Sequence, residues 1–191
     1  MRRALFLDRD GVVNVDVGYV HRIDDFHFVD GVLALARDRA QQGWALIVVT
    51  NQAGIGRGYY SERDFSILTE WMRHRFAEAG APLDAVYHCP YHPEHGVGQY
   101  RLDSFDRKPN PGMLLRARDD LDLDLARSVM VGDTPSDMLA AKRAGVATRI
   151  LYLHGQNATG HQPGNGLAVD ATHIARSMRE VSGMIEADSN Q

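Results

Sequence analysis

Apolar and polar positions along this chain form blocks that predict strands and helices in alternation. Continuous apolar runs of four or five residues indicate buried strands, and apolar residues three or four apart indicate helices. The predicted strands cover residues 4–7, 45–49, 85–88, 128–131 and 148–152, with an edge strand at 168–170. The predicted helices cover residues 31–42, 61–79, 111–119, 136–144 and 174–185. The segment 154–166, rich in Gly, Gln, Asn and His, is predicted to be a surface loop.

The order of these elements predicts the fold class. Strands that alternate with helices are typical of an α/β protein with a doubly wound, mainly parallel sheet, which binds ligands at the carboxyl ends of its strands. A chain of 191 residues is long enough to bury one full core. We therefore expect a single domain over residues 1–191, with residues 185–191 as a frayed tail.

The longest predicted helix has a recognisable start and a buried face. Ser61 is placed to cap its first turn, and Asp64 stands where a capping box has its second partner. Apolar side chains then follow at intervals of three or four residues: Phe65, Leu68, Met72 and Phe76. This spacing predicts a helix that packs one face against the core.

Charge and cysteine content exclude several classes of partner. The net charge is −4, without basic or acidic blocks, so we expect no nucleic acid or membrane surface as a partner. A single cysteine excludes an internal disulfide framework and favours a cytoplasmic protein. The first apolar run ends after four residues, which is too short for the core of a signal peptide. We expect a monomer.

Two carboxylates close together mark the first candidate site. Asp8 and Asp10 follow the predicted strand 4–7 directly, and residues two apart in an extended chain point to the same side. Two such carboxylates ionise together only when a cation lies between them or one of them keeps a proton. A divalent metal on Asp8, with Asp10 as an acid and then a base, meets this requirement. The alternative is an ordinary polar turn at the end of a strand.

Polar residues at other predicted strand ends complete a set suited to phosphoryl transfer. Thr50, Asn51 and Gln52 follow one strand, Asp133 and Asp137 follow another, and Lys108 precedes a predicted helix. A hydroxyl, an amide and an ammonium group can neutralise phosphoryl oxygens, while carboxylates hold Mg²⁺. Each residue alone has an ordinary structural explanation. The ordered combination is far more specific to this chemistry.

In this combination the chain resembles the haloacid dehalogenase-like (HAD) phosphohydrolases. The matching positions, in the order of that family's four motifs, are Asp8 with Asp10, Thr50, Lys108, and Asp133 with Asp137. The resemblance extends over residues 4–152 and implies the HAD-like version of the doubly wound fold. It also implies that Asp8 is a nucleophile that forms an aspartyl-phosphate. Asp10 would protonate the leaving alkoxide and then activate water.

The same resemblance implies a phosphate site and a magnesium site. Thr50 and Lys108 would bind the phosphoryl group. Mg²⁺ would be bound by Asp8, the backbone of Asp10 and Asp133, with Asp137 in a supporting position.

A narrower resemblance concerns the heptose 1,7-bisphosphate 7-phosphatases and the related histidinol-phosphate phosphatases. It rests on Phe6–Gly11, Asp16–His21, Thr50–Gly58, Cys89–Pro93 and Arg107–Met113. The residues that it implies as substrate contacts are Asp16, Gly18, Tyr19, Thr50, Asn51, Gln52, Ala53, Arg57 and Arg107. An arginine suits this role because its planar guanidinium group binds a phosphate through two parallel hydrogen bonds.

One loop departs from that subfamily, which carries a structural zinc site there. Cys89 is present, but Tyr91 replaces a histidine, and Ser104 and Asp106 replace two cysteines. A closed zinc site needs four nitrogen or sulfur donors, so we predict that no zinc is bound. Cys89 and His92 would be ligands only if a degenerate site persisted.

These patterns lead to a functional prediction with alternatives. We expect a capless, Mg²⁺-dependent phosphomonoesterase that acts on a small phosphorylated sugar. By the resemblance, it removes the 7-phosphate of a heptose 1,7-bisphosphate in the biosynthesis of nucleotide-activated heptose for surface polysaccharide. Histidinol phosphate is the alternative substrate, and a non-hydrolytic phosphate-binding module is the alternative from another class. The short spacer between Asp10 and Gly31 leaves no room for a helical cap domain.

Overall fold

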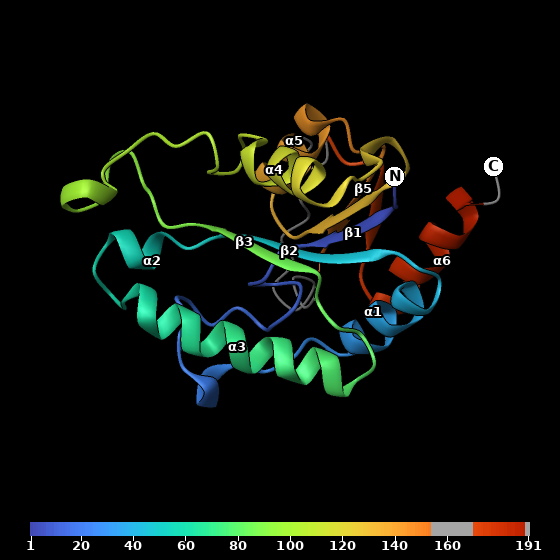
Figure 1. Ribbon diagram of the computed structural model, residues 1–191, viewed down its shortest axis with the longest axis horizontal. Helices are drawn as coiled ribbons and strands as arrows, with labels where there is room; N and C mark the ends of the chain where they lie inside the picture. The colour runs from blue at the N-terminus through green and yellow to red at the C-terminus, as the bar shows by residue number, and fades with distance from the viewer. Residues whose placement is uncertain (154–169, 190–191) are drawn as a thin grey trace.

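In the part of the chain that the structure describes, six parallel strands form one sheet in the order β3-β2-β1-β4-β5-β6 (Figure 1). This computed structural model describes residues 1–153 and 170–189. The strands are β1 (Ala4–Leu7), β2 (Ala45–Asn51), β3 (Ala85–Cys89), β4 (Val129–Gly132), β5 (Thr148–Tyr152) and β6 (His173–Ala175). The doubly wound parallel sheet predicted from the sequence is confirmed.

Helices cover both faces of the sheet (Figure 1). The helices are α1 (Val32–Gln41), α2 (Ala53–Gly56), α3 (Glu62–Glu78), α4 (Gly112–Leu121), α5 (Pro135–Ala144) and α6 (Met178–Ser189). Helices α4 and α5 lie on one face, and α1, α3 and α6 lie on the other. Short 3-10 turns occur at Ile23–Asp25, Gly98–Tyr100 and Leu125–Arg127.

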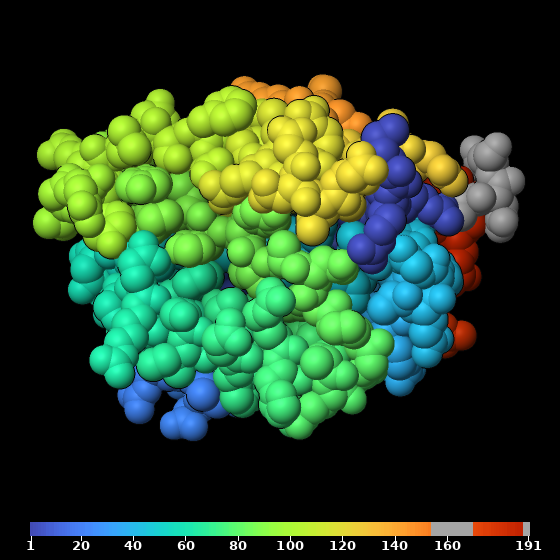
Figure 2. All heavy atoms as spheres, in the orientation of Figure 1, coloured from blue at the N-terminus to red at the C-terminus, as the bar shows by residue number. Residues whose placement is uncertain are grey.

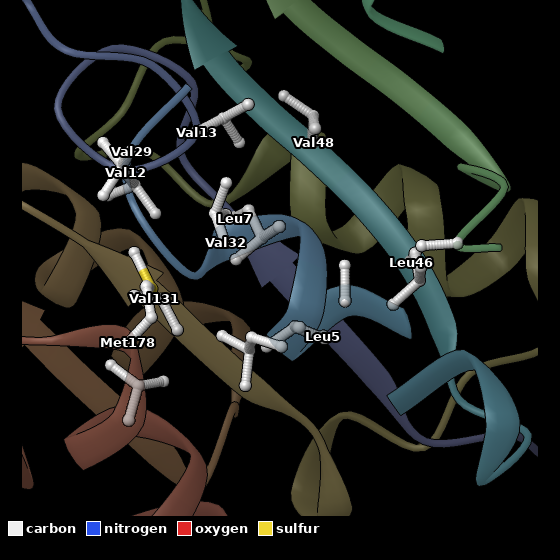
Figure 3. Close-up of a cluster of buried hydrophobic side chains, with 14 of the residues drawn as sticks. Leu5, Leu7, Val12, Val13, Val29, Val32, Leu46, Val48, Val131 and Met178 are labelled. Carbon is white, nitrogen blue, oxygen red and sulfur yellow. The ribbon is translucent and has the colours of Figure 1, made fainter. Parts of the chain in front are cut away.

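Alternating side chains of the strands supply a separate core to each helical layer. In β1, Leu5 and Leu7 belong to the cluster under α1, α3 and α6, whereas Phe6 belongs to the cluster under α4 and α5. Figure 3 shows Leu5 and Leu7 in the first cluster, together with Val32 of α1 and Met178 of α6. All five side chains are almost fully buried, so β1 is fixed from both faces of the sheet.

The path of the chain explains why a site forms at the end of β1. From β1 the chain continues to β2 on one side and later returns as β4 on the other side. In open α/β sheets, ligands bind outside the carboxyl ends of the strands at such a reversal. Asp8 stands at this point, and its backbone N–H donates a 3.0 Å hydrogen bond to Val131 O of β4.

The predicted helix start at Ser61 is confirmed in atomic detail. Ser61 Oγ accepts a 3.1 Å hydrogen bond from the backbone N–H of Asp64, and Asp64 Oδ2 accepts a 2.8 Å bond from the backbone N–H of Ser61. The apolar face of α3 is buried as predicted: Phe65, Leu68, Met72 and Phe76. Reciprocal capping therefore fixes the point at which the chain turns into this helix.

The last part of the fold corrects two predictions and adds an edge strand. This strand is His173–Ala175, and its His173 pairs with Ile150 of β5. Of the predicted edge strand 168–170, Asp170 lies in a turn, and residues 168 and 169 lie outside the described residues. The final helix begins at Met178, four residues after the predicted start. Helix α6 also continues to Ser189, so residues 185–189 are not a frayed tail. Residues 154–166, predicted as a loop, lie outside the described residues.

A long connection between β3 and α4 borders the site. Residues 90–111 contain one short 3-10 turn, and in Figure 2 they form the yellow-green end of the molecule above α2. The Val97 N–H donates a 2.8 Å hydrogen bond to Gly56 O, which ties this connection to α2. In the described part of the chain, no helical cap domain is inserted between β1 and α1, where only Ile23–Asp25 form a short turn.

Candidate active site

A cavity opens at the carboxyl ends of β1, β2 and β4. The residues that line it are Asp8, Asp10, Asp16, Gly18, Tyr19, Thr50, Asn51, Gln52, Ala53, Gly54, Tyr60, Arg107, Lys108, Asp133, Thr134, Ser136 and Asp137. Of the side chains predicted for the catalytic, phosphate, substrate and magnesium sites, Arg57 does not line this cavity. The fold therefore brings together residues that lie more than a hundred positions apart in the chain.

Asp8 is a buried carboxylate with one oxygen held in place. Its Oδ1 accepts a 2.7 Å bond from Lys108 Nζ and a 2.8 Å bond from the backbone N–H of Arg9. Burial raises the pKa of Asp8 to about 7, and the charge of Asp137 adds to this effect while Lys108 opposes it. The hydrogen bonds that the described residues make to this carboxylate converge on Oδ1, which leaves Oδ2 without a hydrogen bond from them.

Lys108 is held rigidly at the centre of the acidic residues. Its Nζ lies 2.7 Å from Asp8 Oδ1, 2.6 Å from Asp137 Oδ1 and 2.8 Å from Val49 O. Although burial disfavours the ammonium ion, Asp137 and Asp8 raise the pKa of Lys108 above its usual range. Asn51 fixes the backbone of Lys108 through two reciprocal 3.0 Å hydrogen bonds. The lysine therefore carries a permanent positive charge at the position where a phosphoryl group would meet Asp8.

Asp133 and its neighbours provide a site suited to a cation. Carboxylate oxygens of Asp8, Asp133 and Asp137 lie within 4.8 Å of one another. Asp133 Oδ1 is buried without a hydrogen-bond partner, and burial, reinforced by the charge of Asp8, raises the pKa of Asp133 to about 8. A buried, unpaired carboxylate beside a second one is stabilised by a divalent cation. Oxygen donors of this kind fit Mg²⁺.

Two glycines make room for this acidic cluster. A Cβ atom at Gly11 would lie 2.0 Å from Asp133 Oδ2, and Gly11 also has a φ of +87°, which favours glycine. A Cβ atom at Gly132 would lie 2.3 Å from the Cβ of Asp137. The glycines beside the two acidic motifs are therefore required by the close approach of the carboxylates.

Asp137 has a structural task as well as an electrostatic one. Its Oδ2 accepts hydrogen bonds from the Thr134 backbone N–H at 3.0 Å and from Thr134 Oγ1 at 2.6 Å. These contacts cap the first turn of α5, while Oδ1 faces Lys108. Asp137 therefore connects the start of α5 to the lysine, and its supporting position at a magnesium site stays a prediction.

Asp10 lines the cavity, and both oxygens of its carboxylate accept hydrogen bonds from N–H groups. Its Oδ1 accepts hydrogen bonds from Arg9 Nη2 at 2.8 Å and from Asn14 Nδ2 at 3.1 Å. Its Oδ2 accepts a single 3.0 Å bond from Gln52 Nε2. One oxygen is thus anchored, and the other keeps a lone pair for proton transfer.

Thr50 and Gln52 line the cavity, but their side chains are almost fully buried. Each is only 1% exposed, and Gln52 Nε2 donates a 2.8 Å hydrogen bond to Thr50 Oγ1. Because Thr50 Oγ1 accepts from Gln52, its own O–H can donate to another acceptor in the cavity. Gln52 is thus placed between Thr50 and Asp10.

The segment that includes Asp16, Gly18 and Tyr19 forms one wall of the cavity. Asp16 Oδ1 accepts a 2.8 Å hydrogen bond from the backbone N–H of Gly18, and both Gly18 and Tyr19 have positive φ angles. The ring of Tyr19 packs edge-on against Tyr59 at 4.7 Å between centroids. These residues therefore add an aromatic and an acidic side chain to the lining of the cavity.

Positive charge gathers at another edge of the cavity. Arg107 lines the cavity and donates a 3.1 Å hydrogen bond from Nη1 to Tyr91 O. Burial lowers the pKa of Arg107, and the positive charge of Arg57 lowers it further. Arg57 Nε is buried without a hydrogen-bond partner. Burial and the charges of Arg107, His95 and Arg57 likewise lower the pKa of His92.

The connection after β3, which contains the candidate zinc ligand His92, is held by hydrogen bonds and ion pairs between its own side chains and backbone and those of α4. Asp106 forms a 2.8 Å ion pair with Arg116, and Asn110 Nδ2 donates a 3.1 Å hydrogen bond to Ser104 O. Cys89 is buried, and burial raises the pKa of its thiol. His92 Nδ1 accepts hydrogen bonds from the backbone N–H groups of Glu94 and His95. The absence of zinc from this loop stays a prediction.

Sequence reasoning missed four residues that line the cavity: Gly54, Tyr60, Thr134 and Ser136. Thr134 and Ser136 lie between Asp133 and Asp137 in the chain, so their position in this acidic motif could have identified them as lining residues. Tyr60 had no such signal, because it reaches the cavity only through the turn that follows α2. A Cβ atom at Gly54 would lie 2.2 Å from the ring of Tyr60, so this glycine permits the close packing of the ring.

Comparisons with known proteins agree with this geometry. A model described as HAD-hydrolase-like matches residues 105–181. The chain is 52% identical to D-glycero-alpha-D-manno-heptose-1,7-bisphosphate 7-phosphatase of Burkholderia mallei over 94% of this chain and 91% of that protein. It is 50% identical to the D-glycero-beta-D-manno-heptose-1,7-bisphosphate 7-phosphatase of Vibrio cholerae, with 93% of each chain covered.

A solved structure is similar over nearly the whole chain. It is D,D-heptose 1,7-bisphosphate phosphatase from B. bronchiseptica, complexed with magnesium and phosphate. The TM-score is 0.81 with 28% sequence identity, and the match covers 97% of this chain and 99% of that chain. The similarity therefore includes the carboxyl ends of the strands, where the cavity described above lies.

Proposed function

Because the chain belongs to the heptose 1,7-bisphosphate 7-phosphatases of the HAD-like hydrolases, which are phosphoric monoester hydrolases, we propose that it removes the 7-phosphate of D-glycero-D-manno-heptose 1,7-bisphosphate. The proposal rests above all on Asp8, whose Oδ1 is held 2.7 Å from Lys108 Nζ beside the unpaired carboxylate of Asp133. The enzyme acts as a cytoplasmic monomer in the biosynthesis of nucleotide-activated heptose. In the described part of the chain, no helix has the length and apolar character needed to cross a membrane.

The first chemical step transfers the phosphoryl group to Asp8. Asp8 Oδ2 forms a bond to phosphorus, and the bond between phosphorus and O7 of the sugar breaks. The electron pair of that bond stays on O7, which takes a proton from Asp10. Lys108 and the hydroxyl of Thr50 stabilise the charge on the phosphoryl oxygens, because both are fixed before the substrate arrives.

The second step returns Asp8 to its starting form. Asp10, now a carboxylate, removes a proton from water, whose oxygen attacks the phosphorus of the aspartyl-phosphate. The bond between Asp8 and phosphorus breaks, and inorganic phosphate leaves. Asp8, the backbone carbonyl of Asp10 and Asp133 would hold Mg²⁺, which would supply positive charge to offset the carboxylates and the phosphoryl oxygens. The Arg9 and Asn14 contacts keep Asp10 in place through both steps.

The arginine edge of the cavity supports a substrate with a second phosphate. The positive charge of Arg57 adds to burial in lowering the pKa of Arg107, and both side chains are partly buried. Two arginines held together in this way favour an anion nearby. Arg107 lines the cavity, so it contacts the 1-phosphate, whereas Arg57 reinforces the local charge.

A panel of phosphate esters tests the proposed substrate. We expect kcat/KM to be highest for heptose 1,7-bisphosphate, with both anomers assayed, and lower for heptose 7-phosphate and histidinol phosphate. Arg107→Ala lowers kcat/KM for the bisphosphate by about 10- to 100-fold, the effect of losing a hydrogen bond to a charged group. The same substitution changes the value for heptose 7-phosphate much less, because that ester has no 1-phosphate.

Arg101→Ala is the matched control for this panel. Arg101 is an exposed arginine in the same connection between β3 and α4, and we expect no change in the ranking. Equal losses for the bisphosphate and the monophosphate in Arg107→Ala would contradict the 1-phosphate contact. Preference for histidinol phosphate in the unaltered protein would replace the proposed substrate.

Magnesium should stabilise the protein more strongly at higher pH. In the metal-free protein the pKa of Asp8 is raised to about 7 and that of Asp133 to about 8, from an ordinary value of 3.8. The folded state therefore binds more protons than the unfolded state between about pH 4 and 8, so the free energy of unfolding falls as pH rises through this range. A bound cation opposes this loss, because it stabilises the buried, ionised carboxylates and offsets the repulsion between them.

Thermal unfolding with excess Mg²⁺ and with EDTA measures this effect. The increase in Tm produced by Mg²⁺ should be larger at about pH 8.5 than at about pH 6. Asp133→Asn should remove most of this pH dependence, because it removes the carboxylate whose pKa is raised most. An equal increase in Tm at both pH values in the unaltered protein would contradict the assignment of these carboxylates to the cation.

A further inference from the structure

We propose that Tyr60 and Gln52 are positioning residues that orient both the hydroxyl of Thr50 and the carboxylate of Asp10. Tyr60 Oη donates a 2.5 Å hydrogen bond to Gln52 Oε1, and Gln52 Nε2 donates to Thr50 Oγ1 at 2.8 Å and to Asp10 Oδ2 at 3.0 Å. One amide thus links the phosphoryl-binding hydroxyl to the proton-transfer group. This inference rests on the proposed roles of Thr50 and Asp10.

The orientation of the Gln52 amide follows from its neighbours. If the amide were reversed, Gln52 Oε1 would face the carboxylate of Asp10, and two acceptors would oppose each other. In the observed orientation both N–H groups meet acceptors. The carbonyl group then needs a donor, which the hydroxyl of Tyr60 provides. The amide therefore has one favourable arrangement, and Tyr60 stabilises it.

The hydroxyl of Tyr60 stays protonated and fixed in place. Burial raises the pKa of Tyr60 to about 12, so its hydroxyl remains a donor at any pH at which the enzyme would work. The ring stacks on His21 at 4.9 Å between centroids, and Tyr60 packs with Ile55 and Phe65. The lack of a side chain at Gly54 leaves room for the ring. Tyr60 is therefore a rigid support for Gln52.

This arrangement fixes which hydrogen-bond role Thr50 and Asp10 each have towards the substrate. Thr50 accepts from Gln52, so its own proton is directed to a phosphoryl oxygen. Asp10 Oδ1 is anchored by Arg9 and Asn14, whereas Oδ2 receives only the N–H of Gln52. The single neutral donor sets the direction of Oδ2 without occupying both of its lone pairs. Loss of the Tyr60 hydroxyl therefore weakens proton transfer to the leaving oxygen as well as phosphoryl binding.

Tyr60→Phe tests this inference, because it removes the hydroxyl and keeps the ring. The value of kcat/KM reflects the steps from substrate binding to the departure of the alcohol. An alkyl alcohol needs a proton from Asp10 to leave, whereas p-nitrophenolate needs one far less. We expect kcat/KM for glycerol 3-phosphate to fall about ten-fold, as for the loss of one buried hydrogen bond. For p-nitrophenyl phosphate we expect a loss of about three-fold or less, from Thr50 alone. Gln52→Met should show the same pattern with larger losses.

A double variant shows whether Tyr60 acts through Asp10. In the Asp10→Asn background, Tyr60→Phe should lower kcat/KM for the two esters by the same small factor, because the proton donor is already absent. Tyr87→Phe is the matched control: it removes a tyrosine hydroxyl that bonds Asp120 at 2.8 Å, outside the cavity, and should leave both values unchanged.

Three outcomes would overturn the inference. They are equal losses for both esters in Tyr60→Phe, unchanged values in Tyr60→Phe and Gln52→Met, and an undiminished difference between the esters in the Asp10→Asn background. Failure of the proposed function is distinguishable from these. If Asp10→Asn itself affects both esters equally, the role of Asp10 is wrong, and the inference about Gln52 falls with it. The identity of the natural sugar does not affect any of these results.

Discussion

Replacement of Asp8 by Asn should abolish phosphatase activity, with a fall in kcat of about 10⁶-fold, as when a covalent nucleophile is removed from an enzyme. The amide oxygen of Asn does not attack phosphorus to form a stable acyl phosphate. The substitution keeps the size of the side chain, and an Asn oxygen still accepts the bond from Lys108. Activity and phosphoenzyme formation should therefore be lost while the fold is kept. Trapping with beryllium fluoride and mass spectrometry of rapidly quenched enzyme measure the phosphoryl acceptor directly.

The control for this experiment is Asp119→Asn. Asp119 is an exposed residue of α4 that pairs with Arg118, so its replacement should leave turnover unchanged. Circular dichroism of both variants should match the unaltered protein. Residual hydrolysis of a phosphate ester above about one-hundredth of the original rate in Asp8→Asn would refute the role of Asp8 as nucleophile.

Replacement of Lys108 by Met should produce the largest loss of stability among single substitutions in the cavity. Lys108 is 3% exposed and forms ion pairs with Asp8 and Asp137 at 2.7 and 2.6 Å. Without the ammonium group, buried carboxylates are left without compensation, which lowers the free energy of unfolding by about 3–5 kcal/mol. The same change removes a fixed charge at the phosphoryl group, so kcat should fall by about 10²- to 10³-fold.

Urea unfolding at neutral pH in EDTA measures the stability change, and Lys142→Met is the matched control. Lys142 also forms a 2.7 Å ion pair, with Asp170, but its side chain is 55% exposed. Removal of this surface pair should change the free energy of unfolding by about 1 kcal/mol or less. A loss in Lys108→Met no larger than that in Lys142→Met would show that the buried pairs do not depend on the ammonium group.

Local sequence patterns were sufficient to predict the order and type of most elements. Apolar runs such as Ala45–Val49 specify strands buried on both faces, and Gly145 marks the end of α5 through a φ of +87°. The same patterns failed near the chain's end. The edge strand has only three residues, His173–Ala175, and Ile174 in it is 36% exposed, so no continuous apolar run marks it. Pairing with β5, rather than local composition, decides where it lies.

The chain by itself determined which chemical groups are available. Phosphoryl transfer is indicated by the sequence alone, through the spacing of Asp8 and Asp10 and through the placement of Thr50, Lys108 and Asp133 after or between apolar runs. This is possible because parallel strands end at the same edge of a sheet, so motifs at strand ends meet in space. Family resemblance added the expected roles of these residues.

Only the tertiary structure decided how these groups are paired. Asn51 and Gln52 follow one another in the chain, yet Asn51 fixes the backbone of Lys108 and Gln52 joins Thr50 to Asp10. Tyr60 enters the cavity because the turn after α2 and the absence of a side chain at Gly54 allow it. Hydrogen-bond partners and burial depend on the packing of several elements at once. The linear pattern of residues therefore specifies which chemical groups this protein has. Its three-dimensional packing sets which partner each group donates to, accepts from or pairs with.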